Sequence, residues 1–161
     1  MKINRIFLLF IGMSFFMSCS LSKMNKTYRK NIHGNWTLTN VDYKNNSGLF
    51  KAKVFNDTDA VCFEGSDWFF RNNNSTGYYT INKPGSCTNG TRNIRWSVYE
   101  PDSGGYQLQF KFTDERKRDL SPYGYRLDIV QLDAETMVLE SKNSVEGSPV
   151  SLIYTFKRTS F

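Results

Sequence analysis

The sequence predicts an all-β fold, an antiparallel up-and-down β-barrel of about eight or nine strands without a long helix. Short runs of alternating apolar and polar residues repeat along the chain, most clearly where Tyr106, Leu108, Phe110 and Phe112 alternate with polar side chains. Turn-forming residues separate these runs at short intervals, and no long stretch has the apolar period of a helix. A sheet of this many strands closes on itself or splits into a sandwich, because free edges invite aggregation.

The predicted strands follow one another from residue 34 onward. The first begins at Gly34-Asn35-Trp36 and alternates through Tyr43, and a turn over 45–48 leads to a second run over 50–55. Residues 61–66 are expected to form one helical turn or an irregular crossing. The remaining strands are expected over residues 68–70, 77–81, 94–98, 106–112, 125–132, 136–141 and 150–158.

The two ends of this region carry motifs that suit each other. Gly34 permits a sharp turn and the close approach of a large ring, and Trp36 begins a strand with one buried face. Arg158 shares a face of the last strand with Val150, Leu152, Tyr154 and Phe156. An arginine in an apolar row is costly unless its plane meets a ring or an acceptor, and stacking on Trp36 would contribute about 1–2 kcal/mol. The alternative is that Arg158 is a frayed terminal residue in water.

The motif Gly34-x-Trp36, followed by many strands and a basic residue on the last one, resembles the opening and closing of a lipocalin-type β-barrel. The resemblance covers residues 34–158. It implies that the Trp36 indole lies across the closed end of the barrel, capped by Arg158. It also implies that the barrel binds a small apolar or amphiphilic ligand. A second tryptophan-anchored turn and a helix before the last strand are not visible, so the chain looks like a shortened form.

The inward faces of the predicted strands supply candidates for contacting a ligand. An eight-stranded barrel has an interior just wide enough for side chains or one small ligand. Aromatic residues make up 16% of the chain, which suits a small barrel that rings either fill or line. Ordinary core packing is the alternative for every candidate. The candidate lining residues are Trp68, Phe70, Trp96, Leu108, Phe110 and Leu127.

The N-terminus has the features of an export signal. Lys2 and Arg5 make it positive, and the apolar stretch over 6–17 is too short for a membrane-spanning helix, which needs about 20 residues. The stretch ends in Phe16-Met17-Ser18-Cys19, which resembles a bacterial lipobox with phenylalanine in place of the usual leucine. This resemblance implies that Cys19 becomes the first residue of a lipoprotein and carries acyl chains such as palmitate, which hold it on a membrane. A secreted protein with an incidental cysteine is the alternative.

The domain boundaries follow from this assignment. We expect a signal peptide over 1–18, the lipidated cysteine with a flexible tether over 19–32, and a lipocalin-like barrel domain over 33–161. The residue after the cysteine is Ser20, not the aspartate that can retain lipoproteins at an inner membrane. We therefore expect the protein in the cell envelope, lipid-anchored on the periplasmic face of the outer membrane. The basic tether could also contact anionic headgroups, although a solvated linker is the simpler interpretation.

Cysteine usage predicts one disulfide. With Cys19 assigned to lipid, Cys62 and Cys87 remain, and an exported protein meets an oxidising compartment. The bridge would close a loop of roughly 25 residues, worth about 3–4 kcal/mol in the chain-entropy interpretation. A thiol metal site lacks partners, because the chain has one histidine and no C-x-x-C pair.

The sequence offers little for catalysis, so we expect neither an enzyme nor a cofactor. His33 precedes the first strand and is more simply a turn residue than part of a Ser-His-Asp relay. Asp57, Asp59, Glu64 and Asp67 lack the glycine-centred spacing of a calcium loop, so a solvated acidic loop and no metal are expected. The net charge of +6 is modest and scattered, which argues against nucleic-acid binding.

Two functions from different classes remain. In the first, the barrel encloses a small apolar or amphiphilic molecule. In the second, the barrel is solid, and the protein is a non-catalytic accessory subunit that docks on a larger cell-envelope complex through its surface. The tyrosine-rich segments Tyr78-Tyr79 and 121–125 suit a protein interface, where tyrosine is enriched. The charged run over 114–119 is expected to be a solvated hairpin loop.

Overall fold

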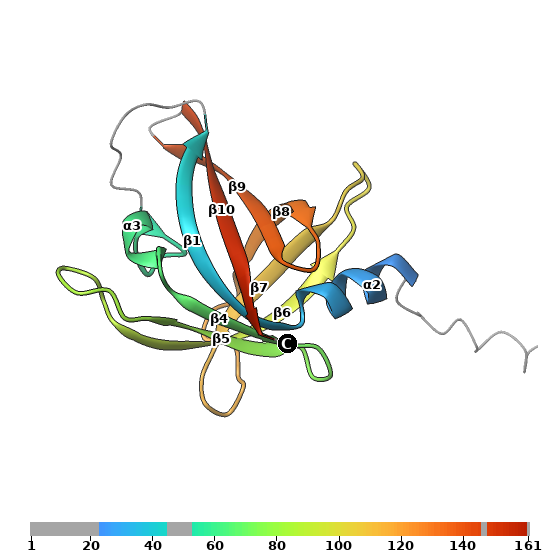
Figure 1. Ribbon diagram of the computed structural model, residues 1–161, viewed down its shortest axis with the longest axis horizontal. Coiled ribbons are helices and arrows are strands. Elements are labelled where there is room, and N and C mark those ends of the chain that lie inside the picture. Colours follow the sequence, from blue (N-terminus) through green and yellow to red (C-terminus); the bar gives the residue numbers. More distant parts are fainter. Residues whose placement is uncertain (1–22, 45–52, 146–147, 161) are drawn as a thin grey trace, which may run out of the picture.

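In the computed structural model, eight antiparallel strands close into a barrel, which confirms the predicted fold class (Figure 1). The structure describes residues 23–44, 53–145 and 148–160. Within them the strands run in the ring order β1-β10-β9-β8-β7-β6-β5-β4, an up-and-down arrangement. The ring consists of β1 (Gly34–Lys44), β4 (Asp67–Arg71), β5 (Thr76–Ile81), β6 (Gly90–Tyr99), β7 (Gln107–Thr113), β8 (Tyr125–Leu132), β9 (Thr136–Val145) and β10 (Ser148–Ser160).

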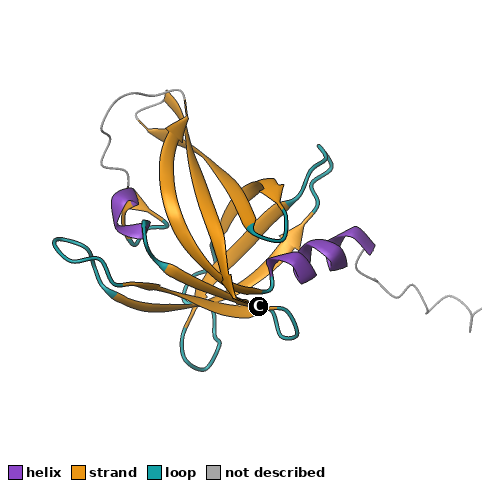
Figure 2. Ribbon diagram, viewed as in Figure 1, coloured by secondary structure: helices purple, strands orange, loops and turns teal. Residues whose placement is uncertain are grey.

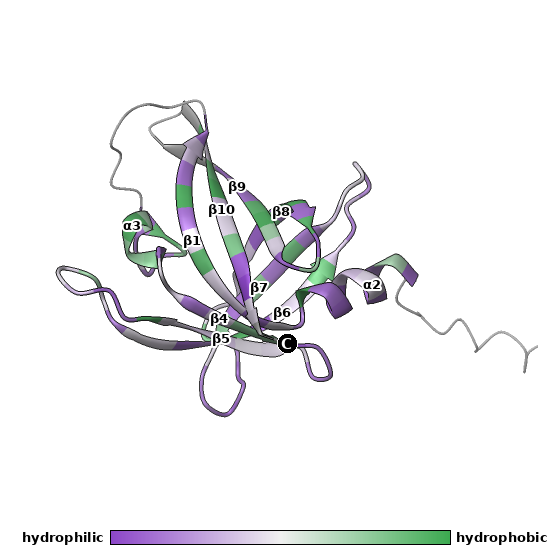
Figure 3. Cartoon of the chain, viewed as in Figure 1, coloured by the Kyte–Doolittle hydropathy of each residue, from purple (hydrophilic) through white to green (hydrophobic). Residues whose placement is uncertain are grey.

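The strands alternate between the core and water because successive side chains point to opposite faces. In β1, Gly34, Trp36 and Leu38 are buried while their neighbours are partly exposed. The same alternation is visible as bands of high and low hydropathy along the strands in Figure 3. β8 alternates less regularly because its pairing with β9 shifts register between Ile129 and Gln131.

The barrel has two different ends. β1 begins and β10 ends at one of them, where Asn35 pairs with Ser160, and we call this the closed end. The opposite end, which we call the mouth, carries the connections over 82–89 and 114–124. α2 (Lys23–Ile32) leads directly into β1 at the closed end, and α3 (Ala60–Phe63) lies toward the mouth (Figure 2). Among the described residues, no helix has the length and hydropathy needed to span a membrane.

α2 corrects the expectation of a flexible tether, which is wrong for residues 23–32. The helix packs on the barrel through one face: Tyr28 stacks on Tyr106 with ring centroids 4.2 Å apart, and Ile32 is fully buried. The Arg29 guanidinium lies 4.9 Å from the centre of the Trp96 ring. Two ring contacts and one aliphatic anchor therefore hold a helix that lacks a broad apolar stripe.

A small hairpin corrects the described part of the strand expected over 50–55; residues 50–52 and the turn expected over 45–48 lie outside the described residues. Within the described residues only β2 (Lys53–Val54) is extended there, and it pairs with β3 (Thr58–Asp59) in a separate two-stranded sheet. We call residues 53–59 the mouth hairpin. α3 follows it directly, so the segment expected over 61–66 to form a helical turn or an irregular crossing has a helical turn that ends at Phe63.

Candidate functional site

Aromatic and aliphatic side chains fill the interior of the barrel. All six predicted lining residues lie there, each at most 3% exposed. Phe70 and Trp96 meet edge to face, with centroids 5.5 Å apart, near the closed end. Leu108 and Leu127 are register partners on β7 and β8. The six predicted residues are Trp68, Phe70, Trp96, Leu108, Phe110 and Leu127, and the structure brings them into one core.

The mouth hairpin places a further ring among them. Phe55 and Asn56 occupy the two central positions of its turn, with φ of 53° and 51°, and the Asp57 amide donates to the Val54 carbonyl at 3.0 Å. These values describe a tight turn with positive φ at both central positions, which normally favours Asn or Gly, and Val54 pairs with Thr58 on the other side of it. The Phe55 side chain is only 8% exposed. Its centroid lies 4.9–6.3 Å from the rings of Phe63, Trp68, Phe110, Tyr125 and Tyr154.

A carboxylate on the same hairpin is held by two side chains of the barrel wall. The Tyr79 hydroxyl donates to Asp57 at 2.6 Å, and Arg92 approaches both carboxylate oxygens at 2.8 Å. The Asp57 and Arg92 side chains are 12% and 16% exposed. Burial and the hydrogen bond to Asp57 raise the pKa of the Tyr79 phenol well above its usual value. The expected solvated acidic loop is therefore wrong for Asp57, because a nearly buried ion pair holds it.

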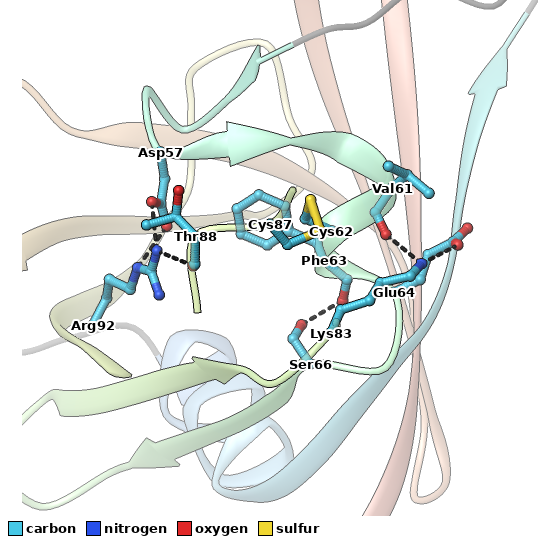
Figure 4. Close-up of a disulfide and its surroundings, with 10 residues drawn as sticks. All are labelled: Asp57, Val61, Cys62, Phe63, Glu64, Ser66, Lys83, Cys87, Thr88 and Arg92. Carbon is cyan, nitrogen blue, oxygen red and sulfur yellow. Dashed lines mark hydrogen bonds and ion pairs between the residues drawn. A yellow bond between two sulfur atoms is a disulfide. The ribbon is translucent and has the colours of Figure 1, made fainter. Parts of the chain in front are cut away.

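Arg92 is held in place by the backbone as well as by the hairpin. Its guanidinium donates to the carbonyl of Thr88 at 2.6 Å and to that of Gly90 at 2.7 Å. Figure 4 shows the guanidinium between Thr88 and Asp57. A second polar contact fixes the hairpin backbone, since the Tyr125 hydroxyl donates to the Phe55 carbonyl at 2.6 Å.

The Cys62–Cys87 disulfide forms as predicted. It joins α3 to the segment over 82–89, with the two Cα atoms 5.5 Å apart (Figure 4). Lys83 supports the same junction by donating to the Val61 carbonyl at 2.6 Å and approaching the Glu64 carboxylate at 3.4 Å. The chain that leaves the mouth hairpin is therefore fastened to the barrel wall.

Trp36 from the first strand and Arg158 from the last strand meet at the closed end. The Arg158 guanidinium lies 4.0 Å from the centre of the Trp36 ring, and Trp36 is fully buried. Arg158 also donates to the carbonyls of Asn31, Ala134 and, at 2.7 Å, His33. The Trp36 indole N–H donates to the Ile32 carbonyl at 2.8 Å.

A groove runs along the outer face of β6 and β7. It has a volume of about 630 Å³ and lies beside the tyrosine-rich segment over 121–125, where Tyr123 is 81% exposed. Gly124 lets this segment lie close to β7, because an added Cβ would come within 2.9 Å of the Phe110 carbonyl oxygen. Three cations and one carboxylate contribute to its lining: Arg95, Lys111, Arg126 and Asp119.

Sequence reasoning missed the residues at the centre of the site. The alternation of the last strand predicts an inward Tyr154, but it does not predict the contact of this ring with Phe55. Phe55 carried no signal, since aromatic residues are rare where φ is positive. Arg92 lies in a run of mixed polar residues, and only the fold brings it beside Asp57.

The chain resembles proteins of one fold family. The lipocalin-like domain family matches residues 32–139. No curated protein matches the chain in sequence. Among solved structures, it is similar to bovine odorant-binding protein with a selenium-containing odorant, at 14% identity and a TM-score of 0.42, over 88% of this chain and 76% of that one. It is also similar to lobster apocrustacyanin A1, at 13% identity and a TM-score of 0.48, over 84% of this chain and 65% of that one.

Proposed function

Because this chain belongs to the lipocalin-like domain family, we propose that it is a non-catalytic binding protein that takes a small apolar or amphiphilic molecule into its barrel. The observation that carries the proposal is the position of Phe55. Its ring lies among four rings of the barrel strands and one ring of α3, yet it comes from a hairpin that is not part of the barrel wall. The barrel thus encloses a space of ring size whose occupant sits on a separate element.

The hairpin pays a conformational cost to reach this position. A bulky residue at positive φ is strained by roughly 1–2 kcal/mol, and burial of a phenylalanine side chain returns about 2–3 kcal/mol. For the Phe55 ring taken alone, this balance is small enough for a ligand to shift, and the polar contacts of the hairpin with Arg92, Tyr79 and Tyr125 add to it. A molecule that brings its own apolar surface can take the place of the Phe55 ring, while the disulfide keeps the end of α3 attached.

Tryptophan fluorescence tests this proposal directly. Trp68 lies 6.3 Å from the Phe55 ring, so displacement of that ring changes the surroundings of an indole. Titration of the intact protein with fatty acids, retinoids and quinones should give a saturable change with at least one class. The proposal fails if the whole panel gives no saturable change and solvent extraction of the purified protein yields no lipid.

We also propose that the protein is a lipoprotein anchored through Cys19 after removal of a signal peptide over 1–18, on the periplasmic face of the outer membrane. Both segments lie outside the described residues, and the lipobox-like motif at 16–19 supports the assignment. Only three residues separate Cys19 from the start of α2, a span of about 14 Å at most. Because α2 packs at the closed end, this anchor would leave the mouth facing away from the bilayer.

Docking on a larger envelope complex is the second candidate function. The outer groove favours it, since the exposed Tyr123 ring and several charged side chains lie beside a surface of about 630 Å³. Purification from membranes in mild detergent should then return a stoichiometric partner, and Tyr123→Ala should weaken its retention. Recovery of the monomer alone would remove this candidate without affecting ligand binding.

A further inference from the structure

The tip of the mouth hairpin presents two chemically different groups to the barrel. Phe55 contributes an apolar ring to the interior, and Asp57, two residues later, contributes a carboxylate to the rim. Each group has its own receptor in the wall. The ring meets other rings, and the carboxylate meets the Arg92 guanidinium and the Tyr79 hydroxyl.

Movement of the hairpin out of the barrel breaks the ion pair and the hydrogen bond that Asp57 makes with the wall. If Asp57 moves away, the Arg92 guanidinium loses the carboxylate that pairs with it, and the Tyr79 hydroxyl loses its acceptor. Removal of one partner from a buried ion pair is strongly unfavourable. A neutral apolar ligand would replace the ring of Phe55 but would leave Arg92 and Tyr79 without their carboxylate. A ligand with an anionic head would supply a replacement for that carboxylate.

The receptor for the head remains formed when the hairpin moves. Arg92 lies on β6, and its bonds to the Thr88 and Gly90 carbonyls do not involve the hairpin. Its guanidinium also lies 5.8 Å from the centre of the Tyr79 ring on β5. A preformed donor pair of this kind needs little reorganisation to accept a second carboxylate.

We propose that the ligand of this barrel is a small amphiphile with a carboxylate head, and that the mouth hairpin is its built-in mimic. The apolar or aromatic body of the ligand replaces the ring of Phe55, and its carboxylate replaces that of Asp57 on Arg92 and Tyr79. The inference rests on the proposed function, since it names the class of molecule that the same site takes.

A matched pair of probes tests the role of the head. Decanoate and 1-decanol have chains of equal length, and only decanoate is charged at pH 7.5. We expect the intact protein to bind decanoate at least ten times more tightly than decanol, measured by tryptophan fluorescence. Arg92→Gln should reduce this ratio to about one. Arg71→Gln, a control on β4 where the guanidinium lies over Phe69 outside the site, should leave it unchanged.

Two further variants keep the test sharp if Arg92→Gln folds poorly. Asp57→Asn removes the competing carboxylate and should tighten decanoate binding several-fold. Tyr79→Phe keeps the buried ring but removes one donor, and should weaken decanoate binding several-fold with little effect on decanol. Equal binding of the two probes to the intact protein would overturn the inference while the proposed function stood. Binding of neither probe, nor of any other apolar molecule, would remove both.

Discussion

The guanidinium of Arg158 lies over the Trp36 ring at the closed end of the barrel, 4.0 Å from the ring centre. The first and last strands of the ring pair with each other, so this contact joins the two ends of the domain at the seam of the barrel. The same guanidinium donates to the His33 carbonyl at the junction of α2 and β1. One side chain thus connects the helix, the seam and the buried indole.

Loss of this contact should destabilise the whole domain. Arg158→Gln should lower the free energy of unfolding by about 2 kcal/mol, because it removes the ring contact and the hydrogen bonds to three backbone carbonyls. Urea denaturation provides the measurement. Lys157→Gln, at the exposed neighbouring position, should change stability by no more than about 0.5 kcal/mol. Equal stability of the two variants would show that the closed end does not depend on Arg158.

Removal of the disulfide should act on both stability and access to the barrel. The bridge spans 25 residues, so the variant with Cys62→Ala and Cys87→Ala should unfold with about 3–4 kcal/mol less free energy. It should also bind apolar probes faster in stopped-flow fluorescence, because α3 is no longer fastened beside the mouth hairpin. Reductant should reproduce both effects in the native protein and have none in the variant. Unchanged binding rates would show that the disulfide does not control access of ligands to the barrel.

The free energy of unfolding should decrease at alkaline pH because of Tyr154, a buried tyrosine of β10. Burial raises the pKa of Tyr154 to about 12, whereas an unfolded tyrosine titrates near 10. Between these values the native state holds a proton that the unfolded state has lost, so stability should fall as the pH rises, by roughly 1.4 kcal/mol per unit. Tyr154→Phe should therefore lose less stability than the native protein between pH 10 and pH 11.5. Tyr123→Phe, at an exposed ring, should behave like the native protein.

Lipidation at Cys19 is testable in a bacterial host. Cells grown with labelled palmitate should label the native protein and send it to the detergent phase of a Triton X-114 separation. Cys19→Ser should lose the label and move to the aqueous phase, while Cys62→Ser should keep the label. Labelling of Cys19→Ser would contradict this assignment.

Much of the fold could be predicted because strand alternation is a local property. Tyr106, Leu108 and Phe110 alternate with polar neighbours, and such runs specify strands whatever their partners. The contact at the closed end could be predicted for a related reason, since an arginine in an apolar row requires a compensating contact. Trp36 was the ring available at the start of the fold.

The mouth of the barrel could not be predicted because its determinants are tertiary. Phe55 takes a backbone conformation that its residue type disfavours, and only the surrounding rings explain it. Asp57 lies in a stretch rich in acids, and nothing local distinguishes a buried carboxylate from a solvated one. α2 was missed because it is held by Tyr28 and Arg29 on rings of the barrel wall, without the apolar stripe of an ordinary packed helix.

The effect of Phe55→Ala on ligand binding tests the central claim most directly, that a hairpin side chain occupies the ligand site. The substitution removes the resident ring while leaving Trp68 as the reporter and Asp57 on the rim. In fluorescence titrations with decanoate, Phe55→Ala should bind at least ten times more tightly than the native protein. Weaker binding by the variant, with its fold intact by circular dichroism, would show that Phe55 belongs to a solid core and that the barrel holds no ligand site there.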